Sequence, residues 1–201
     1  MPTDDDSIRE HIAFTLDVAV RSGYGSKDEI HADLVEQVCD EFRERDTDTI
    51  AAEVARFEAA LDRQWEAQLE AEAGWEPATV NDRLDAAFDE LSRRGIVALQ
   101  DAGYTMSDGW EDVHDAAREI DGAWGGVFFH RQDVERAVDG GGLLLAFGAF
   151  VVGSEHEPES LRLAREVCVV LTAHDIATEW DGTLEQRIAI PPFAWQRRRR
   201  D

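Results

Sequence analysis

The sequence predicts an α+β protein, in which a helical N-terminal region precedes a ferredoxin-like sheet covered by helices. Before Gly95, apolar side chains recur at three- and four-residue steps, which is the period of amphipathic helices. From Gly95 onward, short apolar runs alternate with helical segments, a pattern typical of strands joined by helices. A hydrophobic fraction of 43% in 201 residues is enough for a core that needs neither disulfides nor a structural metal.

Four helices are expected before Gly95. Ser7 with Glu10, and Ser26 with Glu29, have the spacing of capping boxes and predict the starts of the first two helices. The third is expected from about residue 49, and the fourth ends at Gly95. The apolar stripes of the four helices are Ile8, Ile12, Leu16; Ile30, Leu34, Val38, Phe42; Ile50, Val54, Phe57, Leu61, Trp65, Leu69; and Val80, Leu84, Phe88, Leu91.

The second half of the chain predicts the order strand, helix, strand, strand, helix, hairpin. Asp108 with Glu111 is assigned as the capping box of the first helix, and Asp181-Gly182 as the turn of the hairpin. The expected elements are 96–99, 108–120, 126–130, a short helix 133–138, 143–152, 159–174, and the hairpin strands 176–180 and 183–190. The expected domains are a helical region 1–78, a sheet domain 79–194 and a basic tail 195–201.

Negative charge is the strongest compositional feature. Forty-four acidic residues face 20 basic ones, 19 of them arginines, for a net charge of −24. This field repels phosphate backbones and anionic membranes, so we expect neither nucleic acid nor membrane as a partner. Two interpretations stay open: a solvated surface suited to solubility or high salt, which we favour, and an acidic surface that receives a basic protein. The arginines at 197–200 are expected on this acidic surface or on a neighbouring subunit.

The cysteines and the N-terminus predict a cytoplasmic protein. Cys39 and Cys168 lie far apart in apolar helical stretches, and we expect them to be small buried hydrophobes in a reducing compartment. The acidic N-terminus differs from the basic start of a signal peptide, and no apolar run approaches the length of a membrane span.

Polar residues gather where predicted strands end. Tyr104, Thr105, Ser107 and Asp108 lie between a strand and a helix, where ligands bind in many α/β layouts. Their hydroxyl groups and carboxylate are suited to a small polar ligand. The alternative, which we favour, is that Ser107 or Asp108 caps the helix while Tyr104 packs.

His130 follows the next strand, and with Asp133 it has the composition of a general base and its orienting carboxylate. No nucleophile at a known spacing supports this role, and Asp133 suits a helix cap equally well. Trp180, Glu185 and Arg187 are expected as a wall of the same ligand pocket as Tyr104. Glu185 and Arg187 are explained equally well as a solvated cross-strand pair.

Metal and phosphate sites are not expected. Asp108, Glu111, Asp112 and His114 could share a helix face, but such acid clusters arise by chance in so acidic a chain. The glycines at 140–142 follow a helix and precede a strand, the reverse of a phosphate-binding loop, and predict a helix cap and turn. The sequence therefore predicts no metal and no cofactor.

Four segments have a distinctive residue pattern: Arg-Leu-Asp-Ala-Ala-Phe (83–88), Gly-Tyr-Thr-Met-Ser-Asp-Gly (103–109), Gly-Gly-Leu-Leu-Leu-Ala-Phe-Gly (141–148) and Trp-Asp-Gly-Thr-Leu-Glu-Gln-Arg-Ile (180–188). In these segments the chain resembles an uncharacterised bacterial family of domain-of-unknown-function proteins. The resemblance covers most of the chain and implies no established activity. Relatives that carry a cysteine cluster at 103–105 differ here, which argues against a metal site.

Together these observations predict a non-enzymatic binding or protein-interaction module with an acidic surface, whose partner is a protein or a small polar ligand. One alternative is a small-molecule hydrolase or transferase that uses residues 104–108 and His130. The other is an immunity-like acidic protein that binds a basic partner. The sequence assigns no catalytic residue and no oligomeric state.

Overall fold

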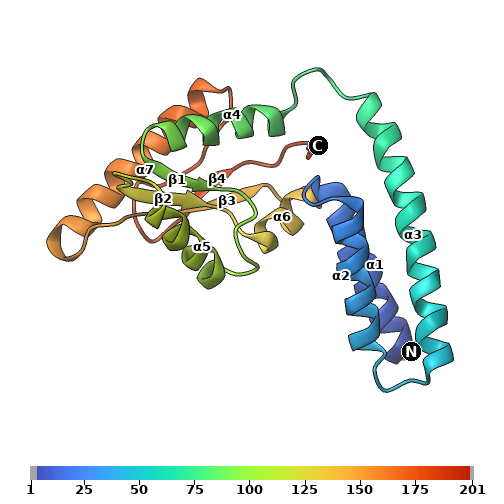
Figure 1. The fold of residues 1–201 in the computed structure, drawn as a ribbon. Coiled ribbons are helices and arrows are strands. Elements are labelled where there is room, and N and C mark those ends of the chain that lie inside the picture. The colour runs from blue at the N-terminus through green and yellow to red at the C-terminus, as the bar shows by residue number, and fades with distance from the viewer. Residues whose placement is uncertain (1–3, 200–201) are drawn as a thin grey trace. The chain divides into compact units, whose positions relative to one another are not determined.

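Residues 4–199 are described by a computed structural model, and they form an α+β protein. The chain divides into two compact units, coloured along the chain in Figure 1. The helical unit comprises the N-terminal part up to Pro77 and the tail from Gln196, and the sheet unit runs Ala78–Trp195. Arg200, expected as part of the basic tail, lies outside the described residues.

The helical unit contains α1 (Asp4–Ser22), α2 (Lys27–Glu41) and α3 (Thr47–Ala73). All three helices contribute apolar stripes to one shared core, as the helical periodicity predicts. The buried members of this core are Ile12, Leu16, Val20, Ile30, Leu34, Val38, Phe42, Phe57 and Leu61. Packing of these faces, rather than intrinsic helix propensity, therefore stabilises the unit.

The predicted start of α2 is confirmed, while that of α1 is wrong. The Ser26 side chain accepts a hydrogen bond from the amide of Glu29, and the Glu29 carboxylate accepts one from the amide of Ser26 at 2.7 Å. Ser7 lies inside α1, because this helix already begins at Asp4 and places three aspartates in its first turn. Negative side chains there interact favourably with the amides and the dipole of the helix.

Cys39 is exposed and Cys168 is only partly buried, so the expected burial of both cysteines is wrong for Cys39. The residue before it, Val38, is fully buried in the core of the helical unit. One step along a helix turns the side chain by about 100°, which carries Cys39 to the outer side. No helix in the described part of the chain combines the length and the apolar character that a bilayer crossing requires.

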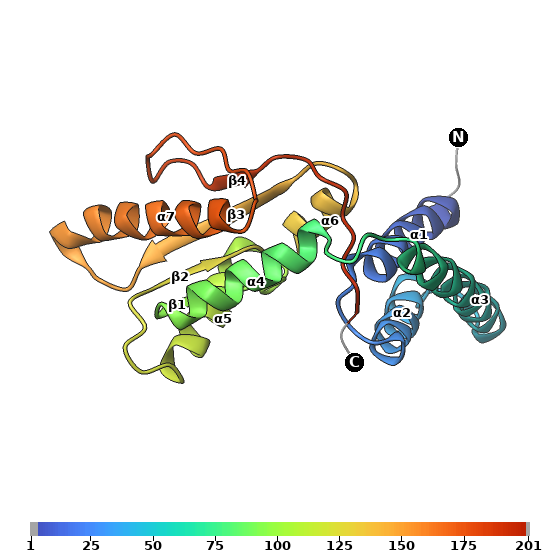
Figure 2. The same ribbon diagram turned by 90° about the horizontal axis from the view of Figure 1, so that it is seen from above.

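The sheet unit has one four-stranded mixed sheet in the order β1-β2-β3-β4. Strands β1 and β2 are parallel, and the other neighbouring pairs are antiparallel. Helices α4 and α7 lie side by side on one face and α5 on the other (Figures 1 and 2). Its elements are α4 (Val80–Arg93), β1 (Ile96–Leu99), α5 (Met106–Arg118), β2 (Gly125–Phe128), α6 (Arg131–Val138), β3 (Leu143–Ala149), a 3-10 turn (Gly153–Glu155), α7 (His156–Ala173) and β4 (Ile188–Ile190).

Two glycines in β2 let helices pack closely on both faces of the sheet. A Cβ on Gly125 would overlap Leu163 of α7, and a Cβ on Gly126 would overlap Val113 of α5. Successive residues of a strand point to opposite faces, so these two contacts place α7 and α5 on opposite sides.

The expected ferredoxin-like arrangement is not confirmed. In a split βαβ arrangement another strand separates the two parallel strands. Here β1 pairs directly with β2, with Leu99 opposite Phe128, and each later strand joins its predecessor. The connection through α5 returns the chain to the position next to β1, and no strand of the described residues lies between β1 and β2.

The expected hairpin at 176–190 is wrong except for its final strand, β4. Its first arm forms only an isolated bridge between Glu179 and Ala189. The Asp181 carboxylate accepts hydrogen bonds from the amide of Thr183 at 3.0 Å and from its hydroxyl at 2.8 Å. The Trp180 indole donates to the Thr183 carbonyl at 2.9 Å. These side-chain bonds fold the segment into a loop in place of a two-residue turn.

Candidate functional site

The carboxyl ends of the parallel strands β1 and β2 bring two helix starts together. The loops that follow the strands are joined by hydrogen bonds from the Ala102 amide to the Phe129 carbonyl and from the Arg131 amide to the Gly103 carbonyl, each 3.0 Å. Helices α5 and α6 begin directly after these loops. In open sheets with parallel strands, ligands bind at this edge.

The start of α5 uses the first group of predicted site residues. Thr105 is the N-cap, and its amide donates to Asp108 Oδ2 at 2.9 Å. This backbone bond, with a further bond from the Thr105 hydroxyl, lowers the pKa of Asp108 below its ordinary value. The predicted pairing of Asp108 with Glu111 is therefore wrong, since Asp108 is the third residue of the helix. Tyr104 stays 54% exposed beside this cap.

His130 is buried at the start of α6, where it is the N-cap. Its Nδ1 accepts a hydrogen bond from the Asp133 amide at 3.3 Å, so in the neutral ring the proton is on Nε2. That nitrogen lies 3.2 Å from the Asp133 carboxylate. Burial lowers the pKa of His130, although the charge of Asp133 opposes the shift. Nδ1 thus faces the Asp133 amide, while Nε2 faces the Asp133 carboxylate and lies 3.4 Å from Arg187 Nη1.

Two buried carboxylates at this edge are paired with arginines from other segments. Arg187, just before β4, donates to Asp133 Oδ2 at 2.8 Å, and Arg131 donates to Asp101 Oδ2 at 2.6 Å. The Asp133 and Asp101 side chains are only 3% and 8% exposed. We call Asp101, His130, Arg131, Asp133 and Arg187 the strand-end cluster.

The sequence interpretation missed Asp101 and Arg131. Asp101 has a φ of 54°, unusual for a residue with a side chain, and it lies two residues after the end of β1. A second missed residue pair lies beside it, where the Gln100 amide donates to the buried Asp85 of α4 at 2.9 Å. The available signal was position: Gln100 and Asp101 follow the parallel strand β1, and Arg131 is the first residue of the helix after β2.

A second group of predicted residues lines a concave pocket of about 500 Å³, which we call the loop pocket. Trp180, Glu185 and Arg187 meet there, whereas Tyr104 is not part of its wall. Arg187 connects the loop pocket with the strand-end cluster through its bond to Asp133. The lining residues are Leu144, Glu179, Trp180, Asp181, Glu185, Gln186, Arg187 and Ala189.

The acidic residues of α5 do not converge on one point. Within residues 4–199, no group of three or more His, Cys, Asp or Glu side chains has an arrangement that could hold a metal ion. The His114 ring lies 5.8 Å from Trp110 and 5.5 Å from Phe150, between centroids, so it belongs to an aromatic cluster. Ser107 is exposed in the first turn of the same helix.

These features define an α+β protein with a three-helix unit and a mixed-sheet unit that carries a charged cluster at its strand ends. Residues 5–199 match the family described as Domain of unknown function (DUF6891), and the chain belongs to this family. The predicted resemblance to an uncharacterised domain family is thereby confirmed. No curated protein matches the chain, and no solved structure matches it.

Proposed function

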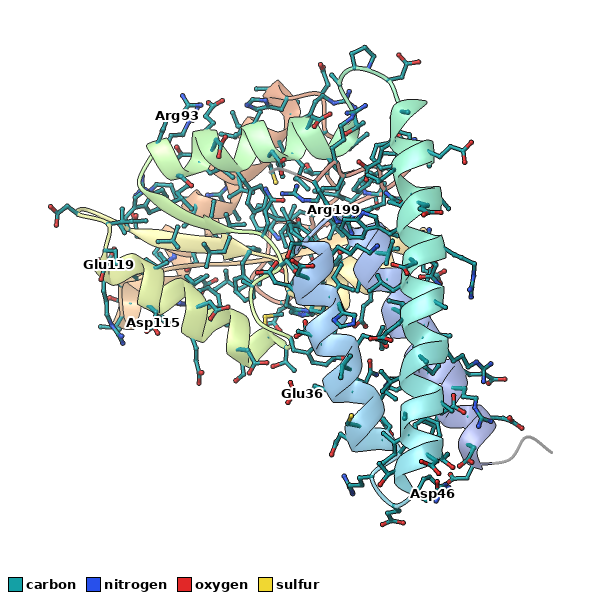
Figure 3. All side chains as sticks on the ribbon, turned by 45° about the vertical axis from the view of Figure 1, so that its right-hand side comes forward. Glu36, Asp46, Arg93, Asp115, Glu119 and Arg199 are labelled. Carbon is teal, nitrogen blue, oxygen red and sulfur yellow. The ribbon has the colours of Figure 1, made fainter. Side chains whose placement is uncertain are left out.

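We propose that this chain is a non-enzymatic binding protein that receives a positively charged protein segment on the acidic surface of its helical unit. The observation that carries the proposal is an exposed stripe on α2, opposite the face that packs in the core. The acidic stripe consists of Glu29, Asp33, Glu36 and Asp40. Among residues 4–199, Asp33 and Glu36 form no ion pair, and Figure 3 shows Glu36 projecting away from α3.

The geometry of the strand-end cluster supports a binding role over catalysis. A hydrolase or transferase of the predicted type needs Tyr104, Asp108 and His130 around one ligand. Tyr104 is exposed, whereas His130 is 5% exposed and both its ring nitrogens face Asp133. A general base needs a nitrogen within hydrogen-bond reach of the substrate proton. We further propose a cytoplasmic location, which the two free cysteines support.

A charge-matched comparison tests the acidic stripe. The Asp33→Asn/Glu36→Gln variant is compared with Asp112→Asn/Glu119→Gln, which removes the same charge from two exposed positions of the sheet unit, one on α5 and one at its C-cap. Binding of a fluorescent octalysine peptide is measured by anisotropy at low and moderate salt. We expect the α2 variant to bind roughly two- to ten-fold more weakly, and the α5 variant to bind as the parent chain does.

Equal weakening in both variants would contradict the proposal, because a uniformly solvated surface responds to total charge alone. Binding that persists unchanged in both variants would contradict it as well. Salt should reduce the parent affinity, since screening shortens the range of exposed charges.

A small polar ligand is a second candidate, favoured by the loop pocket. Its wall combines the Trp180 indole, the Glu185 carboxylate and the Arg187 guanidinium around about 500 Å³, which suits a zwitterion such as a free amino acid. We expect at least one free amino acid to raise the unfolding temperature of the parent chain and not that of Glu185→Gln. Identical temperatures for all twenty would refute this candidate.

A further inference from the structure

The C-terminal tail places three successive arginines on three different aromatic rings of the helical unit. A guanidinium over an aromatic ring is held by the negative face of the π system. We call Tyr24, Trp65 and Trp75 the aromatic face. The Cζ-to-centroid distances are 4.2 Å for Arg197 over Tyr24, 5.6 Å for Arg198 over Trp75 and 4.2 Å for Arg199 over Trp65.

Arg199, labelled in Figure 3, is largely enclosed, with only 13% of its side chain exposed. Its Nη2 donates to the carbonyls of Val20 at 2.5 Å and Ala19 at 3.3 Å, and its Nε donates to the Gly25 carbonyl at 3.2 Å. The Glu72 carboxylate lies 3.7 Å from Nη1. The last carbonyls of α1 thus receive a cation, which the helix dipole favours.

The helical unit also receives the main chain of the tail. Gly23 has a φ of +76°, and a Cβ at this position would overlap the carbonyl oxygen of Arg197. Arg198 donates to the Glu76 carbonyl at 2.7 Å. A planar, forked guanidinium can stack on a ring and donate to several carbonyls at once, whereas the lysine ammonium is a compact point charge. The contacts therefore select arginine over lysine.

We infer that the aromatic face is a recognition site for arginine-rich segments, which the chain's own tail fills and which a basic partner fills by displacing the tail. The inference rests on the proposed function, because it names the chemistry of the partner and adds a second contact region to the acidic stripe. A tethered tail competes at an effective concentration of about a millimolar. The apparent affinity for a partner is the intrinsic affinity multiplied by the fraction of molecules whose aromatic face is open.

Opening the face by substitution tests the inference in the full-length chain. The tail variant carries Arg197→Ser, Arg198→Ser and Arg199→Ser. The control variant carries serine at three exposed arginines of the helical unit and so changes the net charge equally. Its positions are Arg43, Arg56 and Arg63. Affinities for fluorescent hexa-arginine and hexalysine peptides are measured by anisotropy.

We expect the tail variant to bind hexa-arginine at least about ten-fold more tightly than the parent, with a much smaller gain for hexalysine. The control variant should show only the small gain that its added negative charge produces. Adding Trp65→Leu to the tail variant should remove the gain, and circular dichroism checks that this variant is folded. Trp75→Leu replaces it if it is not.

Equal gains in the tail and control variants, or equal gains for both peptides, would overturn the inference. So would dimers of the parent chain that disappear in the tail variant, since the face would then hold the tail of a second copy. If hexalysine binding depends on Asp33 and Glu36 but the tail variant gains no affinity for hexa-arginine, the inference about the aromatic face is overturned and the acidic stripe is retained. A gain in the tail variant with no effect of Asp33 and Glu36 overturns the acidic stripe alone.

Discussion

Replacing Asp133 by alanine tests whether the strand-end cluster is structural. The substitution removes the carboxylate that accepts from Arg187 at 2.8 Å and lies 3.2 Å from His130 Nε2. Removing one partner of a buried ion pair costs about 3–5 kcal/mol, because the other charge stays without compensation. The Arg187 side chain is 29% exposed, so water solvates part of the charge that remains. We therefore expect a loss of about 3 kcal/mol in unfolding free energy, at the lower end of this range.

Urea unfolding followed by circular dichroism measures this loss of unfolding free energy. Asp139→Ala is the matched control, because Asp139 is exposed at the end of the same helix and carries the same charge. We expect it to change stability by no more than about 0.5 kcal/mol. The Asp133→Ala/Arg187→Ala double variant should lose less than the sum of the single losses. If Asp133→Ala costs as little as the control, or if the single losses add, the cluster is not a coupled structural unit.

Two further predictions concern titratable groups. Burial lowers the pKa of His130, so the unfolded chain binds its proton more readily and stability falls as the pH drops through about 6.5, the ordinary histidine value. The slope contributed is at most about 1.4 kcal/mol per pH unit, and His130→Gln should remove it; an unchanged pH profile would contradict the assignment. Cys39 is exposed, whereas burial raises the pKa of the Cys168 thiol, so a disulfide reagent should modify Cys39 first, and equal rates would refute this.

The sequence predicts local structure well where one assignment fits and less well where two overlap. Ser26 with Glu29 has no competing neighbour, and the predicted cap is present. At the start of α5, Thr105 with Asp108 and Asp108 with Glu111 have the same spacing. The structure uses the first pair, so the helix begins one residue after Thr105. An aspartate can serve as the cap or as the third helical residue, and the spacing alone does not distinguish the two positions.

Long-range pairing explains most of what the sequence did not predict. Arg187 is a predicted site residue, but its carboxylate partner lies 54 residues away, on a helix where Asp133 looked like an ordinary cap. Arg199 meets Val20 across 179 residues. Periodicity reports which face of an element is buried, and it carries no information about which distant charge meets that face. The strand order was not predicted for the same reason, because no local pattern in β1 specifies β2 as its neighbour.

The chain has 19 arginines and one lysine. Replacing an arginine by lysine therefore tests whether the shape of the guanidinium matters in addition to its charge. Arg187→Lys keeps the net charge of −24 but replaces the planar guanidinium at the buried Asp133 by a compact ammonium. We expect a loss of about 1–2 kcal/mol in urea unfolding, whereas Arg21→Lys, in an exposed pair with Asp17, should be nearly neutral.

Salt provides the decisive comparison for this pair of variants. Screening should stabilise the parent and both variants similarly, because it relieves the repulsion among the many carboxylates. The deficit of Arg187→Lys should persist at about 1 M salt, since buried pairs are screened far less than exposed ones. A deficit that disappears at high salt would mean that the arginine acts there through its charge alone. The Arg187–Asp133 pair would then respond to salt as the exposed charges of the acidic surface do, and not as a buried ion pair.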